Sequence, residues 1–457
     1  MSKCCNCLEK DVIIHDLENE VEKLKKIINS QKKKEKDGPF GSSTPSSKVP
    51  IKPNTKEDNE ETKGGAKKGH KGNGRRKACH HTADKVDILY NKIDICPECE
   101  ESLISKGYQE RTIIDLENNK PQKILYKCEK KYCKKCKKLY KATPNALERS
   151  LYGNGLIAEA LVMHYFHGIP LGRIEQIFGE NIVNSSLLKV FHRVAKILES
   201  SEGKIIDDYR KSIVKHADET GWRTDGKSGF AWIFCSDNTT IFRHRNTRGS
   251  IVAKEVFGDK ELEGFLVVDR YGGYNRIKCE IQYCYAHLLR AVKDLGKEFN
   301  SEEVQTFVSN LSYYLSEAMH LRNLSISDEE YYKRAEEIKE SIIKVIESPA
   351  SNFGIKNIQS IFKENQHRLY QWCKNRKVPP DNNRAERELR PTVVSRKVSF
   401  GSQSAKGART REIIMTFLHT ASKRVKSQPL ELWFKNVLDK AINNPNIDCY
   451  DLLKDIS

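Results

Sequence analysis

Two pairs of cysteines constrain the fold of this chain more than any other feature of its sequence. Cys96-Pro-Glu-Cys99 and Cys133-Lys-Lys-Cys136 are CxxC knuckles, and a β-like segment, ILYKCEKKY, leads into the second. Four thiolates in this arrangement form a tetrahedral zinc site of the ribbon type. We therefore predict one structural Zn²⁺ ion bound by the four cysteines, with a chance clustering as the alternative.

The remaining cysteines carry weaker signals. Cys79 and Cys128 could replace a zinc ligand, but neither belongs to a CxxC pair. Cys4, Cys5 and Cys7 form a third cluster without an adjacent histidine, and we leave its role unassigned. Scattered cysteines in a reducing compartment are expected to fill the core rather than form disulfides. These are Cys235, Cys279, Cys284, Cys373 and Cys449.

The charge of the chain favours a polyanionic partner. Its 457 residues include 80 lysines and arginines against 62 acidic residues, a formal net charge of +18. Nucleic acid suits this balance, although lysines that only solvate the surface would produce it as well. The sequence contains neither a long uncharged apolar run nor a signal-peptide core, so we expect a cytoplasmic, nucleoid-associated protein. A chain of this length is expected to form several folded units.

The N-terminal segment has the heptad pattern of a short coiled coil. Ile14, Val21 and Ile28 share one heptad position, and Leu17 and Leu24 share the other, which favours a parallel dimer. The alternative is an amphipathic helix that packs on its own chain. Residues 37–88 follow as a flexible basic linker rich in Ser, Pro, Gly and Lys.

Three short helical patterns between residues 146 and 205 resemble a helix-turn-helix unit. In such a unit the last helix enters the DNA major groove, which makes Ser185, Ser186, Lys189 and Arg193 candidates for DNA contact. A helical spacer without DNA contact is the alternative.

Beyond residue 206 the pattern changes to strands followed by βαβ alternation. Asp218 ends the strand-like SIVKHAD, and Asp269 ends the strand-like GFLVVD. Asp381 can cap a helix after Pro379-Pro380 that places Glu386 in its second turn. Each acid has an ordinary alternative role, as a turn or cap residue for the aspartates and as an ion-pair partner of Arg390 for Glu386. A charged helical segment at 293–375 separates the last two acids.

Taken together, the motifs of this chain resemble the IS66 family of bacterial insertion-sequence transposases. The stretches that carry the resemblance are SSKVPIKPN, GGAKKGHKG, the two CxxC knuckles, HADETGWR, VVDRYGGYN, CYAHLLR, DNNRAERELRP and SRKVSFGS. The resemblance implies an RNase H-like (retroviral-integrase-like) α/β catalytic core of DDE type. It assigns the catalytic, metal-binding triad to Asp218, Asp269 and Glu386, with Mg²⁺ or Mn²⁺ as the cofactor.

The resemblance also implies how the chain acts. Two metal ions would support cleavage of DNA at terminal inverted repeats and strand transfer into target DNA, and a homodimer or higher oligomer and small accessory proteins of the same element would take part. A DNA-binding regulator or a nuclease without strand transfer are the alternatives. We expect Arg387, Arg390, Arg396 and Lys397 to contact DNA phosphates near the metals.

Four further residues near the triad have predicted roles. We expect Glu219 to point to the opposite face of its strand from Asp218. Asn383 is predicted to position Glu386 or the substrate. Cys284 and His287 are predicted to have core and supporting roles rather than to bind metal.

The predicted organisation is a multidomain α+β protein. Its units are a coiled coil (1–36), the basic linker (37–88), a zinc-binding domain (89–145), a helical DNA-binding domain (146–205), a catalytic domain (206–425) with a helical insertion (293–375), and a C-terminal helical tail (426–457).

Overall fold

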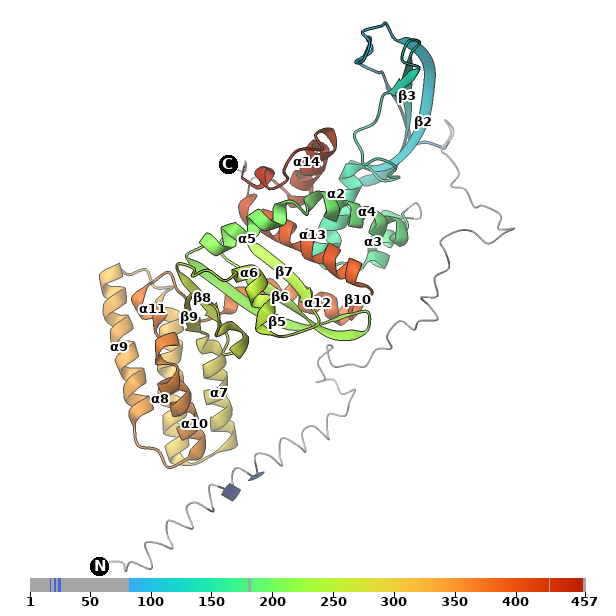
Figure 1. Ribbon diagram of the computed structural model, residues 1–457. Helices are drawn as coiled ribbons and strands as arrows, with labels where there is room; N and C mark the ends of the chain where they lie inside the picture. Colours follow the sequence, from blue (N-terminus) through green and yellow to red (C-terminus); the bar gives the residue numbers. More distant parts are fainter. Residues whose placement is uncertain are drawn as a thin grey trace, which may run out of the picture.

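The computed structural model describes residues 82–179, 182–426 and 428–454, together with Leu17, Glu20, Val21, Leu24 and Lys25. Most of the predicted coiled coil and linker therefore lies outside the described residues. The five described residues near the N-terminus are helical, and Leu17, Val21 and Leu24 are exposed. The described part is a mixed α/β structure with two separate sheets (Figure 1).

The first sheet forms an arm that projects from the body (Figure 1). It consists of β1 (Lys85–Leu89), β2 (Ile104–Glu117), β3 (Lys120–Cys133) and β4 (Lys138–Lys141). β2 and β3 pair over nearly their whole length. Asn118 and Asn119 join them with positive φ angles of 49° and 59°, as a tight hairpin turn requires. Because β1 also pairs with β3, the sheet begins slightly before the predicted boundary at residue 89.

The turn end of this hairpin is attached to the body. The backbone of Ile114 bonds to Leu151 and Gly153, and Asp115 Oδ1 accepts from Leu156 N at 2.8 Å. Gly153 lies so close to the Asp115 side chain that a Cβ atom there would approach it to 2.1 Å. From Ile114 to Ile104 the strand extends for ten residues, or about 33 Å at the usual rise per residue. The opposite end, which carries the cysteines, therefore lies far from the body.

Helices follow the arm, as predicted. They are α2 (Asn154–Leu161), which continues as the π-helix η1 (Val162–Phe166), α3 (Leu171–Phe178), α4 (Asn184–Leu198) and α5 (Ser201–Lys211). α4 buries Leu187, Phe191 and Val194 and contacts α13 (Ala405–Arg424). The C-terminal helix α14 (Leu430–Asn443) packs on α2, so the predicted tail belongs to the folded body.

The second sheet forms the centre of the molecule. Its strands are β5 (Val214–Thr224), β6 (Lys227–Cys235), β7 (Thr240–Arg245), β8 (Phe265–Val268) and β9 (Glu280–Tyr283). Their order is β7-β6-β5-β8-β9, and the two-residue β10 (Gly401–Ser402) adds to β5. β5, β6 and β7 are antiparallel, whereas β8 and β9 run parallel to β5. The connection from β7 to β8 contains α6 (Ser250–Phe257).

Helix α13 covers the edge strand β7. Thr420 Oγ1, Thr416 Oγ1 and Glu412 Oε1 accept hydrogen bonds from the backbone N–H groups of Thr240, Phe242 and His244, respectively. Unpaired N–H groups on a sheet edge invite pairing with other chains. Side chains of α13 replace the missing neighbouring strand.

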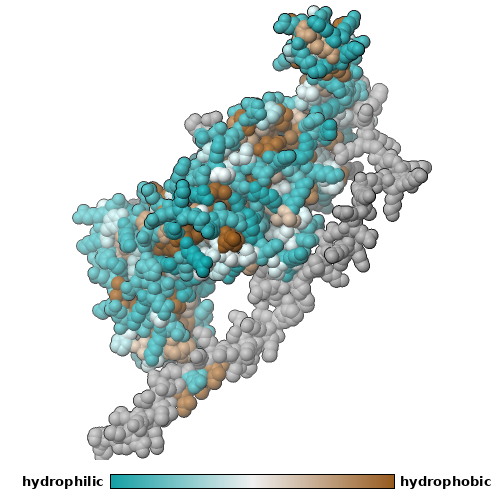
Figure 2. All heavy atoms as spheres, viewed as in Figure 1, coloured by the Kyte–Doolittle hydropathy of each residue, from teal (hydrophilic) through white to brown (hydrophobic). Residues whose placement is uncertain are grey.

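A helical bundle is inserted between β9 and α12 (Asn383–Ser399) (Figure 1). It comprises α7 (Tyr285–Glu298), α8 (Glu302–Leu321), α9 (Asp328–Glu347), α10 (Phe353–Glu364) and the short α11 (Gln371–Lys374). The predicted boundary at residue 293 falls within α7, because this helix begins immediately after β9. The face of the molecule shown in Figure 2 is mostly hydrophilic. None of the helices in the described ranges is long and apolar enough to cross a membrane.

Candidate active site and metal centre

Two parallel strands bring the first two candidate acids to neighbouring positions. β5 and β8 are in register from Val214 opposite Phe265 to His216 opposite Val267. Two residues further along each strand lie Asp218, within β5, and Asp269, just after β8. Asp269 Oδ1 accepts a hydrogen bond from Tyr271 N at 2.9 Å. The sequence pattern correctly identified both strands.

Glu386 is brought to the same region by α12, which packs on β5 and β6. The start of this helix is fixed by Asn382, a fully buried residue. Asn382 Nδ2 donates to Ala217 O at 2.8 Å, and its Oδ1 lies 3.0 Å from His216 Nδ1. The sequence analysis favoured Asn383, but Asn383 is exposed. The sequence does not indicate which of the two adjacent asparagines, Asn382 or Asn383, faces the sheet.

Asp381 Oδ1 accepts from Asn383 N at 3.0 Å, but the N-cap position is Asn382, one residue after the predicted cap. Glu386 therefore lies in the first turn of α12 rather than the second. Cys284 also supports the start of the helix, because its Sγ accepts from Asn382 N at 3.1 Å. Burial raises the pKa of the Cys284 thiol to about 11, so it stays protonated at neutral pH. His287 Nδ1 lies 3.9 Å from Glu386 Oε1. Both placements agree with the supporting roles predicted for Cys284 and His287.

The neighbouring carboxylates act on Asp218 electrostatically. Burial, followed by the charges of Glu219, Asp269 and Glu386, raises the pKa of Asp218 to about 8, and a backbone hydrogen bond from Glu219 opposes this rise. Hard carboxylate oxygens are the ligands that Mg²⁺ prefers. A divalent cation would offset the repulsion among these carboxylates, so the donor set fits such an ion.

The three acids do not form a compact single-ion site. In the described ranges, the cysteine cluster is the one group of three or more candidate ligand atoms that all lie within 4.8 Å of one another. Carboxylates that surround two ions about 4 Å apart need not meet that limit.

Glu219 is fully engaged by protein groups. Its side chain is buried, and its Oε1 lies 2.6 Å from Arg248 Nη2. Tyr274 donates its hydroxyl to Oε2 at 2.5 Å. Glu219 thus has protein partners for both oxygens, and its charge also acts on the neighbouring Asp218.

The candidate DNA-contacting residues divide into two groups. Lys189, Arg193, Arg387, Arg390 and Lys397 are exposed. Arg396 is instead buried, and its Nη1 donates to Thr220 Oγ1 at 2.7 Å and to Gly221 O. The expectation that Arg396 faces DNA does not agree with this placement, because α12 turns it toward β5.

Comparison with known proteins identifies the family. The family profile described as "Transposase IS66 family" matches residues 149–410, which is more than half of the chain. The chain belongs to the IS66 family of transposases. The uncharacterized protein y4qI of Sinorhizobium fredii is 23% identical over 335 residues, covering 65% of this chain and 61% of that protein. The aligned region thus spans less than two thirds of the length of this relative.

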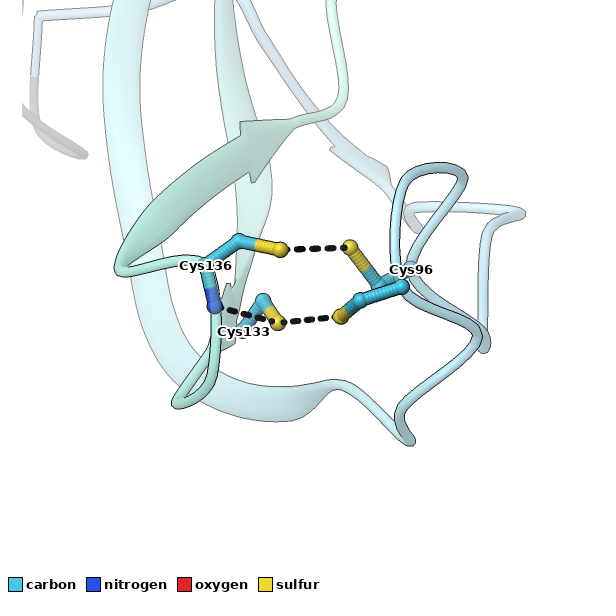
Figure 3. A group of neighbouring side chains, drawn as sticks. Cys96, Cys133 and Cys136 are labelled. Atoms are coloured by element: carbon cyan, nitrogen blue, oxygen red, sulfur yellow. Dashed lines mark hydrogen bonds between the residues drawn. The ribbon is translucent and has the colours of Figure 1, made fainter.

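The second candidate metal site lies in the arm, which precedes the residues matched by the IS66 family profile. The Sγ atoms of Cys96, Cys99, Cys133 and Cys136 all lie within 4.8 Å of one another. The Cys96–Cys136 and Cys99–Cys133 separations are 3.9 and 3.4 Å. Figure 3 shows the side chains of Cys96, Cys133 and Cys136 directed toward one another. A tetrahedral ion with Zn–S bonds of about 2.3 Å places its sulfurs about 3.8 Å apart, so the cluster fits zinc.

Local backbone geometry shapes both knuckles of this IS66-family chain. Cys96 N donates to Glu101 O at 2.8 Å, and Cys136 N donates to Cys133 Sγ at 3.3 Å. Tyr140, which the sequence analysis missed, places its hydroxyl 3.3 Å from Cys96 Sγ and lowers the pKa of that thiol. A thiolate is the metal-binding form of cysteine. The possible substitute Cys128 lies outside the cluster, and Cys79 lies outside the described residues.

Proposed function

We propose that this transposase cleaves DNA at the ends of an insertion sequence and joins the freed 3′ ends to target DNA. The observation that carries the proposal is the convergence of Asp218, Asp269 and Glu386 from β5, β8 and α12. The strand order, with three antiparallel strands followed by two parallel ones, supports an RNase H-like core of DDE type.

In the proposed mechanism, the three carboxylates would hold two Mg²⁺ or Mn²⁺ ions, which would activate the attacking oxygen and stabilise the leaving oxygen. Asn382 fixes the start of α12 on β5 and would thereby hold Glu386 in the region of Asp218. His287, beside Glu386, helps to orient its carboxylate. No covalent bond between protein and DNA is required.

The proposed DNA contacts come from two surfaces. On α4, Ser185, Lys189 and Arg193 are spaced one helical turn apart and are exposed, while the opposite side of the helix packs on α13. Arg193 also donates to Glu148 O at 2.6 Å. Near the acids, Arg387, Arg390 and Lys397 extend into solvent from α12. These cations would bind phosphates.

A strand-transfer assay tests the proposed function. Terminal inverted repeats should flank the gene, and a duplex ending in such a repeat should be incubated with the protein, Mg²⁺ and a plasmid. We expect duplex ends covalently joined to the plasmid. Cleaved but unjoined ends would indicate a nuclease, and binding without cleavage would indicate a regulator. Either result would contradict the proposal.

We also propose that the segment 1–36 pairs two chains. The exposure of Leu17, Val21 and Leu24 supports a helix whose apolar residues pack against another chain. A short seam is weak alone, but binding of both chains to DNA raises their local concentration. We predict that deleting residues 1–36 reduces pairing of two distinguishable end duplexes in a gel-shift assay more than it reduces binding of one. Equal loss of both would reject the dimer seam.

A further inference from the structure

Arg248 lies at the edge of the acidic site and is held there on two sides. It belongs to the loop between β7 and α6. Its guanidinium stacks over the ring of Tyr271, 4.0 Å from the ring centroid. The Tyr271 hydroxyl in turn donates to the Arg248 carbonyl oxygen, and Tyr271 N donates to Asp269. One tyrosine thus ties the arginine to the second acid.

Glu219 holds the other side of the guanidinium. Arg248 Nε donates to Glu219 Oε1 at 2.8 Å, and Nη2 lies 2.6 Å from the same oxygen. Within the described residues, the two N–H groups on Nη1 make no hydrogen bond, and 45% of the side chain is exposed. The arginine is therefore positioned by one edge and open to solvent along the other.

Gly273 is required by this arrangement. A Cβ atom at Gly273 would lie 2.3 Å from the Tyr271 ring, so any larger residue would displace the ring on which Arg248 rests. This gives a physical reason for the second glycine of the RYGGY segment. The ordering of an exposed arginine by a buried carboxylate and an aromatic ring is what a ligand-binding side chain requires.

We propose that the Nη1 edge of Arg248 binds a phosphate of the DNA backbone next to the one that is cleaved. This inference rests on the proposed function, since it takes the three acids as the point of cleavage. Arg248 is suited to phosphate because guanidinium presents several N–H groups in a fixed plane. Glu219 is the positioning residue that sets its direction.

The pairing of Glu219 with Arg248 limits the negative charge of this region. Asp218, Asp269 and Glu386 remain for the proposed metal ions, and the neutral Glu219–Arg248 pair lets a DNA phosphate approach the free N–H groups of Arg248. If Glu219 were unpaired, the acidic excess would repel the DNA backbone instead.

The test compares DNA binding by variants in Ca²⁺ without Mg²⁺, so that it does not depend on cleavage. Arg248→Gln alone would leave Glu219 buried without its partner. The informative variant is therefore the double substitution Glu219→Gln with Arg248→Gln, which removes both charges. The control is Lys339→Gln on α9, a partly exposed cation that pairs with Glu336. The probe is a short fluorescein-labelled duplex of mixed sequence, titrated at several salt concentrations.

We expect the double variant to keep the melting temperature of the wild type, to bind about tenfold more weakly and to lose about one unit of salt slope, as for one lost phosphate contact. Wild-type affinity and slope would show that Arg248 is only the counterion of Glu219. If the double variant has a lower melting temperature than the wild type, the single variant Arg248→Lys is measured instead. It keeps the charge, so weaker binding at an unchanged slope supports a directed contact, whereas unchanged affinity overturns it. These binding measurements can be interpreted even if the strand-transfer assay fails, because they do not depend on cleavage.

Discussion

Replacing Asp218, Asp269 or Glu386 with the matching amide is expected to lower DNA cleavage by at least about 100-fold while end binding persists. Loss of a residue that only supports a metal ligand costs about 10- to 100-fold, and a direct ligand should cost more. Cleavage is measured in Mg²⁺ with a labelled end duplex, and binding by gel shift. Near-normal cleavage by one variant would remove that residue from the triad.

Asp225→Asn is the matched control for the aspartates. Asp225 lies in the β5–β6 turn with a φ of 54°, a conformation that asparagine tolerates well. The same change of carboxylate to amide is therefore made on the same hairpin but away from the acids. We expect cleavage and stability close to those of the wild type.

The same substitution at Asp218 should also stabilise the protein when no Mg²⁺ is present. The pKa of Asp218 is raised from its ordinary value of 3.8 to about 8. The folded state therefore holds the proton more tightly than the unfolded state, and stability is lost as pH rises from about 4 through about 8. Asp218→Asn removes this loss, so at pH 8 its melting temperature should exceed that of the wild type by about 2 °C or more. Buffers without chelator preserve any zinc, and a melting temperature below that of Asp225→Asn would contradict the expectation.

Cys133→Ser is expected to reduce bound zinc from one ion per chain to none. Closed four-thiolate sites contribute about 10–16 kcal/mol of binding energy to folding in zinc-finger peptides. We expect the knuckles at the distal end of the arm to unfold and DNA binding to weaken, with the acids unaffected. The attachment of Ile114 and Asp115 to the body predicts that the turn end of the hairpin persists.

Zinc content by mass spectrometry and amide hydrogen exchange along β2 and β3 measure this prediction. Cys128→Ser is the matched control, because Cys128 is a buried cysteine of β3 outside the cluster. The control should retain its zinc. Wild-type protein that lacks zinc after purification without chelator would reject the site.

Strand-end acids and the helical insertion could be predicted because they depend on local patterns. Apolar runs that end in an acid predicted where Asp218 and Asp269 lie, and paired CxxC knuckles predicted a cluster that the structure confirms. These features depend on neighbours in the sequence. Contacts between distant elements could not be predicted in this way.

The sequence did not predict the contacts made by Arg396, Asn382 and Glu219. Their positions depend on how α12 and the loop at Arg248 pack against β5, which no local pattern contains. Arg396 has the charge of a DNA contact but is buried beside Thr220. Glu219 was expected only to point to the opposite face of its strand from Asp218. Its bonds to Arg248 and Tyr274 now predict an intermediate defect for Glu219→Gln, because the arginine loses its direction.

The hydrogen bonds between Asn382 and β5 can form only late in synthesis of the chain. Asn382 and His216 are 166 residues apart, and the whole helical insertion lies between them. At about 5–20 residues per second, a ribosome needs about 8–33 s to make this interval. A nascent chain therefore carries Asp218 and Asp269 well before Glu386 exists. Copies that end before Glu386, through a frameshift or a stop codon, lack the third acid and also lack α13 and α14, on which α4 and α2 pack.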